Sequence, residues 1–326
     1  MSRNRQRGVA LLTVLLLVAV MTVLVIGVLD DIRFGLRRAS NAQSVAQAQW
    51  YAIGAETLAQ MQIRQLARRD SARTTLDGGW NDKPFLFPID NGAISARVFD
   101  STTCFNLNSV VEGAGEQWQR RELGVNQFTA LLQALEFSTR EAEGLADALV
   151  DWIDADQTRS EFGAEDSAYK GRQPGYRTSG TLLSEASELR AIHGFNAGVY
   201  ARLRPHVCAL PVADLSPINI NTLEANNAVI LTMLTSGLLG TRQARRVIAA
   251  RPADGWRDYA SFWGQPALAQ ITVPNPVLNQ IALRTRYFGL YAEVEYGDAQ
   301  VVLTALFEQD AAGETSLIAR RWTPDE

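Results

Sequence analysis

The sequence has few of the residues on which most metal and redox chemistry depends. Among 326 residues there are two histidines and two cysteines. Two cysteines cannot form a Cys-only zinc site, and two histidines argue against His-rich metal or relay chemistry. The sequence also lacks the Gly-Lys pair of a phosphate-binding loop, the HExxH zinc motif and the GxSxG serine elbow. We therefore expect a protein that is not an enzyme.

Positive charge is also limited. The 31 basic residues include only two lysines, Lys83 and Lys170, and 35 acidic residues bring the net charge to −4. This balance argues against a generally basic surface that coats nucleic acid. With 47% hydrophobic and 20% charged residues, the chain is neither disordered nor a multi-span membrane protein.

The longest stretch without charge lies near the N-terminus, from Val9 to Leu29. These 21 residues would span about 30 Å as a helix, which is the hydrocarbon thickness of a bilayer. A secretory signal peptide is the alternative, but its apolar region is shorter and ends at a small-residue cleavage site. The preceding segment MSRNRQRG is basic and the run is closed by Asp30 and Asp31. The pattern predicts a transmembrane segment with its N-terminus inside and its C-terminus outside.

The helical pattern continues beyond the apolar run to about Arg69 without a proline. Apolar residues recur with helical spacing, so we expect one helix of about 90 Å. Gly35 and the Asp30–Asp31 pair are the expected places for a bend. The alternative is a simple anchor followed by an independent helix.

The N-terminal segment resembles that of type IV pilin-like precursors, in which a short basic leader ends in Gly and the apolar helix stays on the mature protein. The resemblance implies cleavage by a prepilin peptidase between Gly8 and Val9, and methylation of the mature chain. Thr13 then occupies mature position five, where most pilins and pseudopilins carry Glu. A missing Glu at this position is typical of the minor pseudopilin K family of the type II secretion system.

Strand patterns occur at two places far apart in the sequence. Apolar and polar residues alternate from Gly92 to Asp100, and then again in the runs 288–295, 300–308 and 316–322. Helical patterns fill the segment between them. Because a lone strand is not stable in water, we expect the early strand to pair with the late ones. The predicted fold class is α+β, in which a pilin-like long N-terminal helix packs on an antiparallel sheet interrupted by a large inserted all-α domain.

These patterns divide the chain into five expected regions, and this organisation resembles that of the same family. Residues 1–8 form the leader and 9–29 the transmembrane segment. Residues 30–110 form the pilin-like helix and first strand or strands, 111–282 the inserted α-domain, and 283–326 the C-terminal strands that complete the sheet.

Acidic residues are concentrated between Asp147 and Asp166, where seven carboxylates accompany one base, Arg159. Asp154, Asp156 and Glu165 occupy positions one, three and twelve of a twelve-residue loop, as in an EF-hand. Arg159 stands where that motif needs glycine, so the loop is not an EF-hand. The residues alone leave two interpretations open, a site for a hard cation and a solvated acidic surface.

Several motifs resemble the central signature of the minor pseudopilin K family. They are VDWIDAD (150–156), GAEDSAY (163–169), PGYRTSG (174–180) and SEL (187–189), flanked by FNLNSV (105–110) and ININT (218–222). The family binds calcium around its acidic loop. The resemblance implies Ca²⁺ ligands at four carboxylates, with Asp151 and Glu161 as weaker candidates: Asp154, Asp156, Glu165 and Asp166.

The two cysteines lie on the outer side of the predicted membrane segment. Residues beyond Asp31 are expected to face an oxidising periplasm, where disulfides persist. We therefore predict a disulfide between Cys104 and Cys208, and two separate buried thiols are the alternative.

A second resemblance concerns residues 218–263, which are similar to a helix-hairpin-helix module. In such a module a Gly-containing turn and basic residues contact nucleic-acid phosphates. The basic residues here are Arg242, Arg245, Arg246 and Arg251. The turn GLLG (237–240) departs from the usual GIG spacing, which favours a structural helix pair. A membrane-anchored DNA-binding protein of the competence type is the alternative function.

The family resemblance implies a role in assembly. We expect a minor pseudopilin at the tip of the type II secretion pseudopilus, with minor pseudopilins I and J as direct partners. Minor pseudopilin H and the major pseudopilin G are expected below, and no nucleic acid is expected as a partner. The implied location is the inner membrane, crossed once, with the C-terminal domain in the periplasm.

Overall fold

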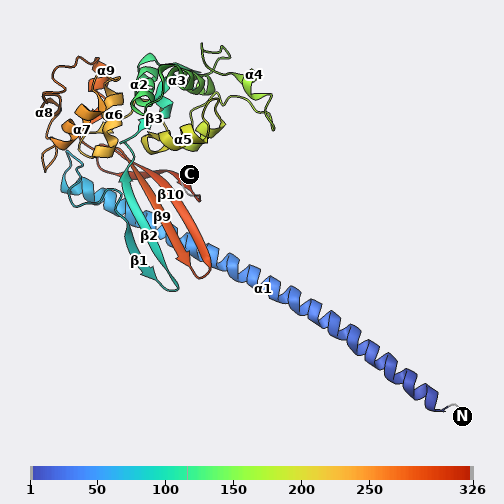
Figure 1. Cartoon of the computed structure of the whole chain (residues 1–326). Helices are drawn as coiled ribbons and strands as arrows, with labels where there is room; N and C mark the ends of the chain where they lie inside the picture. Colours follow the sequence, from blue (N-terminus) through green and yellow to red (C-terminus); the bar gives the residue numbers. More distant parts are fainter. Residues whose placement is uncertain (1–2, 116, 324–326) are drawn as a thin grey trace.

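The first element is a long helix that reaches from the N-terminus into the folded part of the chain. A computed structural model describes residues 3–115 and 117–323, and the side chains from Val9 onward. Helix α1 (Arg3–Arg69) is continuous, with no interruption at Gly35 or at the Asp30–Asp31 pair (Figure 1). The prediction of one continuous helix is therefore confirmed.

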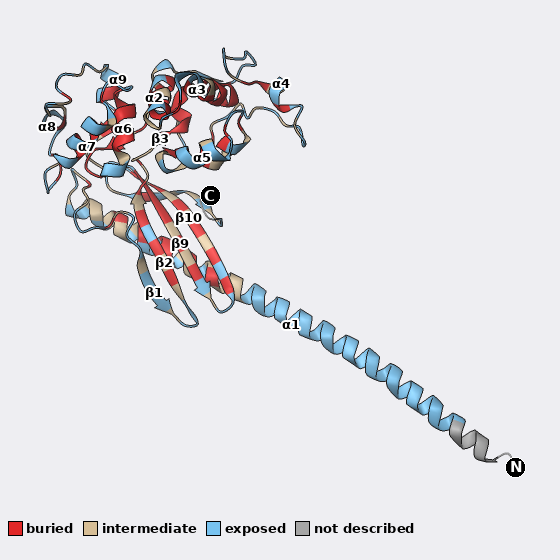
Figure 2. Ribbon diagram, in the orientation of Figure 1, coloured by how far each residue is buried: buried red, intermediate tan, exposed pale blue. Residues whose placement is uncertain are grey.

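The two halves of α1 have different surroundings. From Val9 to Gln43 every described side chain is exposed, and the helix projects away from the rest of the protein (Figure 2). Its second half packs on the sheet through a row of small residues and one isoleucine: Ala48, Ala52, Ala55, Ala59 and Ile63. Their spacing of three to four residues places them on one helix face. Because the alanines are small, the helix backbone lies close to the strands.

One face of a five-stranded antiparallel sheet packs against α1. The strand order is β1-β2-β9-β10-β11, so the early strand β2 pairs with the late strand β9. The bounds are β1 (Phe85–Ile89), β2 (Gly92–Asp100), β9 (Tyr287–Tyr296), β10 (Ala299–Gln309) and β11 (Thr315–Arg321). Alternate residues of β2, β9 and β10 form a hydrophobic core with the alanine face of α1. The predicted α+β fold is confirmed.

The inserted helical domain lies beyond one end of this sheet and has its own hydrophobic core (Figure 1). Its elements are β3 (Phe105–Asn106), η1 (Leu107–Val110), β4 (Val111–Ala114), β5 (Gln117–Arg120), α2 (Glu122–Ala134), α3 (Thr139–Ile153), α4 (Asp166–Tyr169), η2 (Ala186–Ala191), α5 (Ala197–Leu203), η3 (Arg204–His206), β6 (Val207–Cys208), β7 (Ile218–Asn219), η4 (Ala225–Asn227), α6 (Ala228–Leu234), α7 (Thr241–Ala249), α8 (Tyr259–Trp263), α9 (Asn275–Leu278) and β8 (Ile281–Ala282).

The structure places the first boundary of this domain earlier than residue 110. Phe105, Leu107 and Val110 are completely buried in the helical core, and β3 pairs with β6 of the same domain. The predicted boundary placed residues 105–110 with the pilin-like part of the chain. Instead the chain turns after Asp100, and Phe105 stacks on Phe128 at a ring-centroid distance of 5.1 Å.

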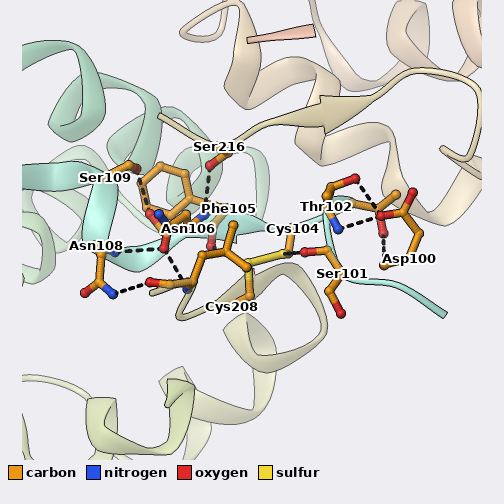
Figure 3. Close-up of a disulfide and its surroundings, with 12 residues drawn as sticks. Asp100, Ser101, Thr102, Cys104, Phe105, Asn106, Asn108, Ser109, Cys208 and Ser216 are labelled. Carbon is orange, nitrogen blue, oxygen red and sulfur yellow. Dashed lines mark hydrogen bonds between the residues drawn. A yellow bond between two sulfur atoms is a disulfide. The ribbon is translucent and has the colours of Figure 1, made fainter. Parts of the chain in front are cut away.

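The two domains meet at a junction that contains a disulfide bond and a buried carboxylate (Figure 3). Cys104 lies just before β3 and is bonded to Cys208 at the end of β6. Asp100, the last residue of β2, accepts hydrogen bonds from the hydroxyls of Thr222 and Thr285. These contacts join the sheet to the ININT segment and to the strand that leaves the helical domain.

Candidate metal centre

Helix α3 supplies the first acidic residues of the site. It begins with a reciprocal cap, in which the Ser138 hydroxyl accepts from Glu141 N–H and the Glu141 carboxylate accepts from Ser138 N–H at 3.0 Å. Asp147 and Asp151 are one turn apart on this helix, and Asp154 is its C-terminal cap residue. The helix thus delivers three carboxylates toward the loop that follows.

The loop brings three of the predicted ligands together. Each of Asp154, Asp156 and Glu165 offers a carboxylate oxygen, and these oxygens all lie within 4.8 Å of one another. Asp154 and Glu165 are 7% and 5% exposed, whereas Asp156 is open to solvent. The cluster therefore has two buried carboxylates and one at its entrance.

The buried oxygens of this cluster lack hydrogen-bond donors among the described residues. They are Oδ1 of Asp154 and both carboxylate oxygens of Glu165. Burial, with repulsion from Asp156 and Asp151, raises the pKa of Asp154 to about 7. Burial and repulsion from Asp151 raise the pKa of Glu165 to about 7 as well. A bound cation would supply the missing partners and favour both ionised forms.

Asp151 on α3 holds the backbone of the loop through hydrogen bonds. Its side chain is completely buried. Both of its carboxylate oxygens lie 3.2 Å from Ser160 N–H, which donates to them. A Cβ on Gly163 would lie 2.1 Å from Asp151 Oδ2, so only glycine fits at this point of the loop. Glu161, the other weaker candidate, is exposed.

Asp166 is not brought into the cluster. It lies in the first turn of α4, and its Oδ1 accepts from the backbone N–H and the hydroxyl of Thr178. Its Oδ2 lies 3.5 Å from Lys170 Nζ and 3.7 Å from Arg177 Nε. These contacts give Asp166 a structural role in holding the segment that follows the loop.

Asp147 pairs with Arg120, which the sequence did not predict. Nη1 of Arg120 donates to Asp147 Oδ1 at 2.8 Å, and the N–H of Phe162 donates to the other oxygen at 3.1 Å. This ion pair places one positive charge beside the acidic loop. No sequence signal identifies it, because β5, which carries Arg120, is 27 residues away.

The donor set suits a hard cation. All three clustered ligands are carboxylates. The loop backbone turns at Asp156, whose side chain accepts a hydrogen bond from Thr158 N–H at 2.6 Å. Oxygen-only ligands on an irregular loop are those that Ca²⁺ prefers. The orphaned oxygens of Asp154 and Glu165 fit such an ion.

The other predicted sites lie elsewhere in the structure. Val9 and Thr13 are in the exposed half of α1, and the Thr13 hydroxyl donates to Ala10 O at 2.9 Å. For Gly8 the structure describes only the backbone, as part of α1. Among the helices described, α1 is the one that is long and apolar enough to cross a membrane, and its apolar part makes no contact with the folded domains.

The helix pair formed by α6 and α7 packs into the core of the helical domain. All seven residues of α6 are buried, and α7 contributes Ala244, Val247 and Ile248. Arg242, Arg245 and Arg246 are exposed on the other side of α7. Arg251 instead donates from Nη1 to the carbonyl oxygen of Leu223 within the domain.

Comparisons with known proteins agree with this architecture. Two family profiles with the description "Type II secretion system (T2SS), protein K" match residues 103–212 and 218–284. The type II secretion system protein K of Aeromonas hydrophila is 35% identical over 98% of both chains. That of Klebsiella pneumoniae is 34% identical over 99% of both.

A solved structure shows the same fold. It is the crystal structure of the GspK-GspI-GspJ complex from the type 2 secretion system of enterotoxigenic Escherichia coli. The matched chain has 30% identity and a TM-score of 0.77, over 88% of this chain and 99% of that one. None of these comparisons supports the DNA-binding alternative. The chain therefore belongs to the protein K family of the type II secretion system, whose members are minor pseudopilins.

Proposed function

We propose that the chain is the assembly subunit at the tip of a type II secretion pseudopilus and serves protein export across the outer membrane. The observation that carries this proposal is the position of the helical domain. It lies beyond the end of the sheet that is farthest from the N-terminus of α1 (Figure 1). A further subunit stacked above the sheet would collide with it, so the fibre would end at this chain.

The residue at mature position five supports the same position. A glutamate in the bilayer requires a partner of opposite charge, such as the N-terminal amine of a neighbouring subunit, because an unpaired charge is expensive there. Thr13 carries no charge, and its hydroxyl is satisfied by Ala10 O in its own helix. The chain therefore carries no charge at this position that the N-terminal amine of a subunit above it would have to neutralise in the membrane.

The exposed apolar half of α1 is the proposed anchor in the inner membrane. Arg3, Arg5 and Arg7 precede this segment, and Asp30 and Asp31 follow it. This asymmetry favours an inside N-terminus and a periplasmic C-terminal domain. A disulfide between Cys104 and Cys208 fits an oxidising compartment.

The proposed direct partners are the minor pseudopilins I and J, because the structural relative was solved in a complex with GspI and GspJ. Minor pseudopilin H and the major pseudopilin G would lie below this group. A prepilin peptidase would process the chain between Gly8 and Val9. An assembly role requires neither nucleic acid nor a catalytic group.

Native mass spectrometry of the full chain with pseudopilins I, J and G tests the tip position. We expect a complex with one copy each of this chain, I and J, to which G adds at one end only. A variant in which a short Gly-Ser linker replaces residues 105–282 would remove the obstruction and serve as a comparison. Complexes that contain several copies of the intact chain in series would contradict the proposal.

We also propose that the acidic loop binds Ca²⁺ through Asp154, Asp156 and Glu165. These are the carboxylates that the loop brings together, and their buried oxygens have no donor among the described residues. Asp166, which the family resemblance included, would act by holding the adjacent segment through Thr178. Mg²⁺ should substitute poorly because it needs a strict octahedron of ligands.

Thermal unfolding of the full chain in calcium and in chelator tests this site. An ion that binds only the folded state adds about 2.7 kcal/mol at a hundredfold excess over its Kd. The double change Asp154→Asn with Glu165→Gln should remove the calcium response. The control is Glu161→Gln, which changes an exposed acid outside the cluster and should leave the response intact. Equal Tm values of the unmodified chain in calcium and in chelator would contradict the proposal.

A further inference from the structure

Strand β10 is longer than the strand beside it. β10 runs from Ala299 to Gln309, but β11 pairs with it only from Thr304 onward. The first five residues of β10 therefore have β9 on one side and no strand among the described residues on the other. This leaves an unpaired edge at the end of the sheet nearest the membrane anchor (Figure 1).

The direction of the backbone groups along β10 follows from its hydrogen bonds. Gln309 N–H donates toward the β9 side, to Arg286 O, and Asp310 N–H donates toward the β11 side, to Glu314 O. Because these directions alternate along an antiparallel strand, even-numbered residues of β10 point toward the β11 side. Gln300 and Val302 thus present two N–H and two C=O groups at the unpaired edge.

The opposite edge of the sheet, strand β1, carries a proline that limits strand addition, and the unpaired segment of β10 does not. In β1, odd-numbered residues bond to β2, since the hairpin turn is closed by the pair Ile89 and Gly92. The outward positions are Leu86 and Pro88, and proline has no N–H to donate. The exposed edge of β1 therefore offers a single N–H, from Leu86. Proline on an edge is a common protection against strand addition.

A notch of about 530 Å³ adjoins the unpaired segment of β10. Val45 of α1 and Trp322 form its apolar walls, and Tyr291 and Val302 lie beside them. Its volume lies within the ~300–1,000 Å³ range of ligand pockets. Among the described residues that line it, Glu293 is the charged one.

We propose that this notch, formed by Gln300, Val302, Val45 and Trp322, is a strand-addition site for an extended segment of another protein. The incoming strand would pair with the outward groups of Gln300 and Val302, as in other recognition modes that add a strand to a sheet edge. Main-chain hydrogen bonds would supply affinity, and the side chains would supply selectivity.

The charges around the notch specify the chemistry of the incoming segment. Val302 pairs with Glu293 and Gln300 pairs with Glu295, so these side chains share the sheet face that is turned away from α1. Residues of the added strand on that face would lie beside Gln300 and Val302, about 10 Å from the two glutamates of β9, a distance that the long side chains of Lys or Arg can bridge. Residues that alternate with them would face Val45 and should be apolar. The expected partner segment thus alternates basic and β-branched residues.

Hydrogen exchange and peptide binding test the site in the full-length chain in lipid nanodiscs. The probe is the acetylated, amidated hexapeptide Lys-Val-Lys-Val-Lys-Val. It should bind with a Kd below 1 mM, on the order expected for a few main-chain hydrogen bonds. It should also slow exchange of the Gln300 and Val302 amides at least tenfold. The block sequence Lys-Lys-Lys-Val-Val-Val and the acidic Glu-Val-Glu-Val-Glu-Val should each bind about tenfold more weakly.

A matched pair of variants isolates the edge backbone. Val302→Pro removes an outward N–H without removing a bond to β9, and it should weaken peptide binding about tenfold. Val302→Thr keeps the N–H and should bind within about threefold of the unmodified chain. Equal binding of the alternating and block peptides would overturn the proposal. So would slow exchange of the Gln300 and Val302 amides in the free protein, since another part of the chain or a second copy would then already cover the edge.

Discussion

The carboxylate of Glu56 on α1 is held by the guanidinium of Arg320 on β11. Nε of Arg320 donates to one oxygen at 2.7 Å, and Nη2 donates to the other at 2.9 Å. Glu56 is 6% exposed, and the two residues are 264 positions apart in the sequence. The pair fixes the long helix against the last strand of the sheet with two parallel, charge-assisted hydrogen bonds.

Removal of the arginine should destabilise the fold. Arg320→Met keeps the aliphatic stem but leaves the buried Glu56 carboxylate without these donors. We expect a loss of about 1–3 kcal/mol in the free energy of unfolding, measured by urea denaturation. Glu314→Gln is the control, because its contact with Arg64 at 3.9 Å is mostly solvent-exposed and should contribute less than about 0.5 kcal/mol. Equal effects of the two changes would argue against a stabilising role of the buried pair.

Loss of the disulfide should loosen the attachment of the helical domain. Cys104 and Cys208 are 104 residues apart, and chain entropy assigns about 4–5 kcal/mol to a loop of this length. The double change of both cysteines to serine should lower the denaturation midpoint, and so should a reducing agent on the unmodified chain. If reductant shifts the midpoint of the serine variant equally, the effect is not due to this bond.

Gly163→Ala should disrupt the acidic loop. The added Cβ would lie 2.1 Å from Asp151 Oδ2, so the loop or α3 must shift. We expect a destabilisation of about 1–3 kcal/mol and weaker calcium binding by calorimetry. Gly171→Ala is the matched control, since a Cβ there has no neighbour within 4 Å. Unchanged calcium affinity in Gly163→Ala would show that the geometry of Asp151 does not support the cluster.

The carboxyl of Asp100 should make stability depend on pH. Burial raises its pKa above the ordinary value, although hydroxyls of Thr102, Thr222 and Thr285 donate to it. The folded state then holds a proton that the unfolded state has lost, so this contribution is complete below about pH 4 and declines as pH rises. Asp100→Asn removes the titration. The unmodified chain should therefore lose stability relative to this variant as the pH rises above about 4, as measured by denaturation at several pH values. A difference that is constant with pH would contradict this expectation.

Processing at the predicted junction can be followed with the prepilin peptidase. A β-branched side chain in place of Gly8 should block cleavage, so Gly8→Val should accumulate as the full-length precursor on gels. Thr13→Val, which changes a residue within the apolar helix, should be processed normally. N-terminal sequencing of a mature chain that begins after Leu29 would indicate an ordinary signal peptide instead.

Much of the fold could be predicted because its elements carry strong periodic signals. Strands β2 and β10, and β9 from Leu290 onward, alternate between buried positions and partly or fully exposed ones, since one face packs on α1. Strand β1 was missed. Its residues Leu86, Phe87 and Pro88 are all exposed, so the sequence FLFPI has no alternation to detect. The periodic pattern predicts short helices over 185–192 and 223–235, and the structure forms the first as the 3₁₀ helix η2 and begins the second with the 3₁₀ turn η4.

The candidate metal site could be predicted in part. Asp154, Asp156 and Glu165 follow a local spacing, and local spacing determines which carboxylates one loop can gather. Asp166 is adjacent in sequence to Glu165, but its orientation depends on Thr178, which lies twelve residues further on. The burial of Asp151 depends in turn on how α3 packs in the helical core, and a single helix pattern does not specify that.

The way the chain passes between the two domains has a mechanical consequence. The strand that leads into the helical domain and the strand that returns from it are neighbours, since Asp100 pairs with Phe288 and Ser101 N–H donates to Tyr287 O at 2.9 Å. A load applied along α1 from the membrane therefore reaches the helical domain through two adjacent covalent connections, which hydrogen bonds such as Thr222 to Asp100 and Asn219 to Thr74 O reinforce. Two covalent connections side by side resist stretching and twisting of the junction. They resist sideways bending of the helical domain much less, so the junction can act as a hinge. The bond from Cys104 to Cys208 ties the entering connection to β6 of the helical domain, so an oxidised chain would transmit a push from the membrane with less tilt of this domain than a reduced one.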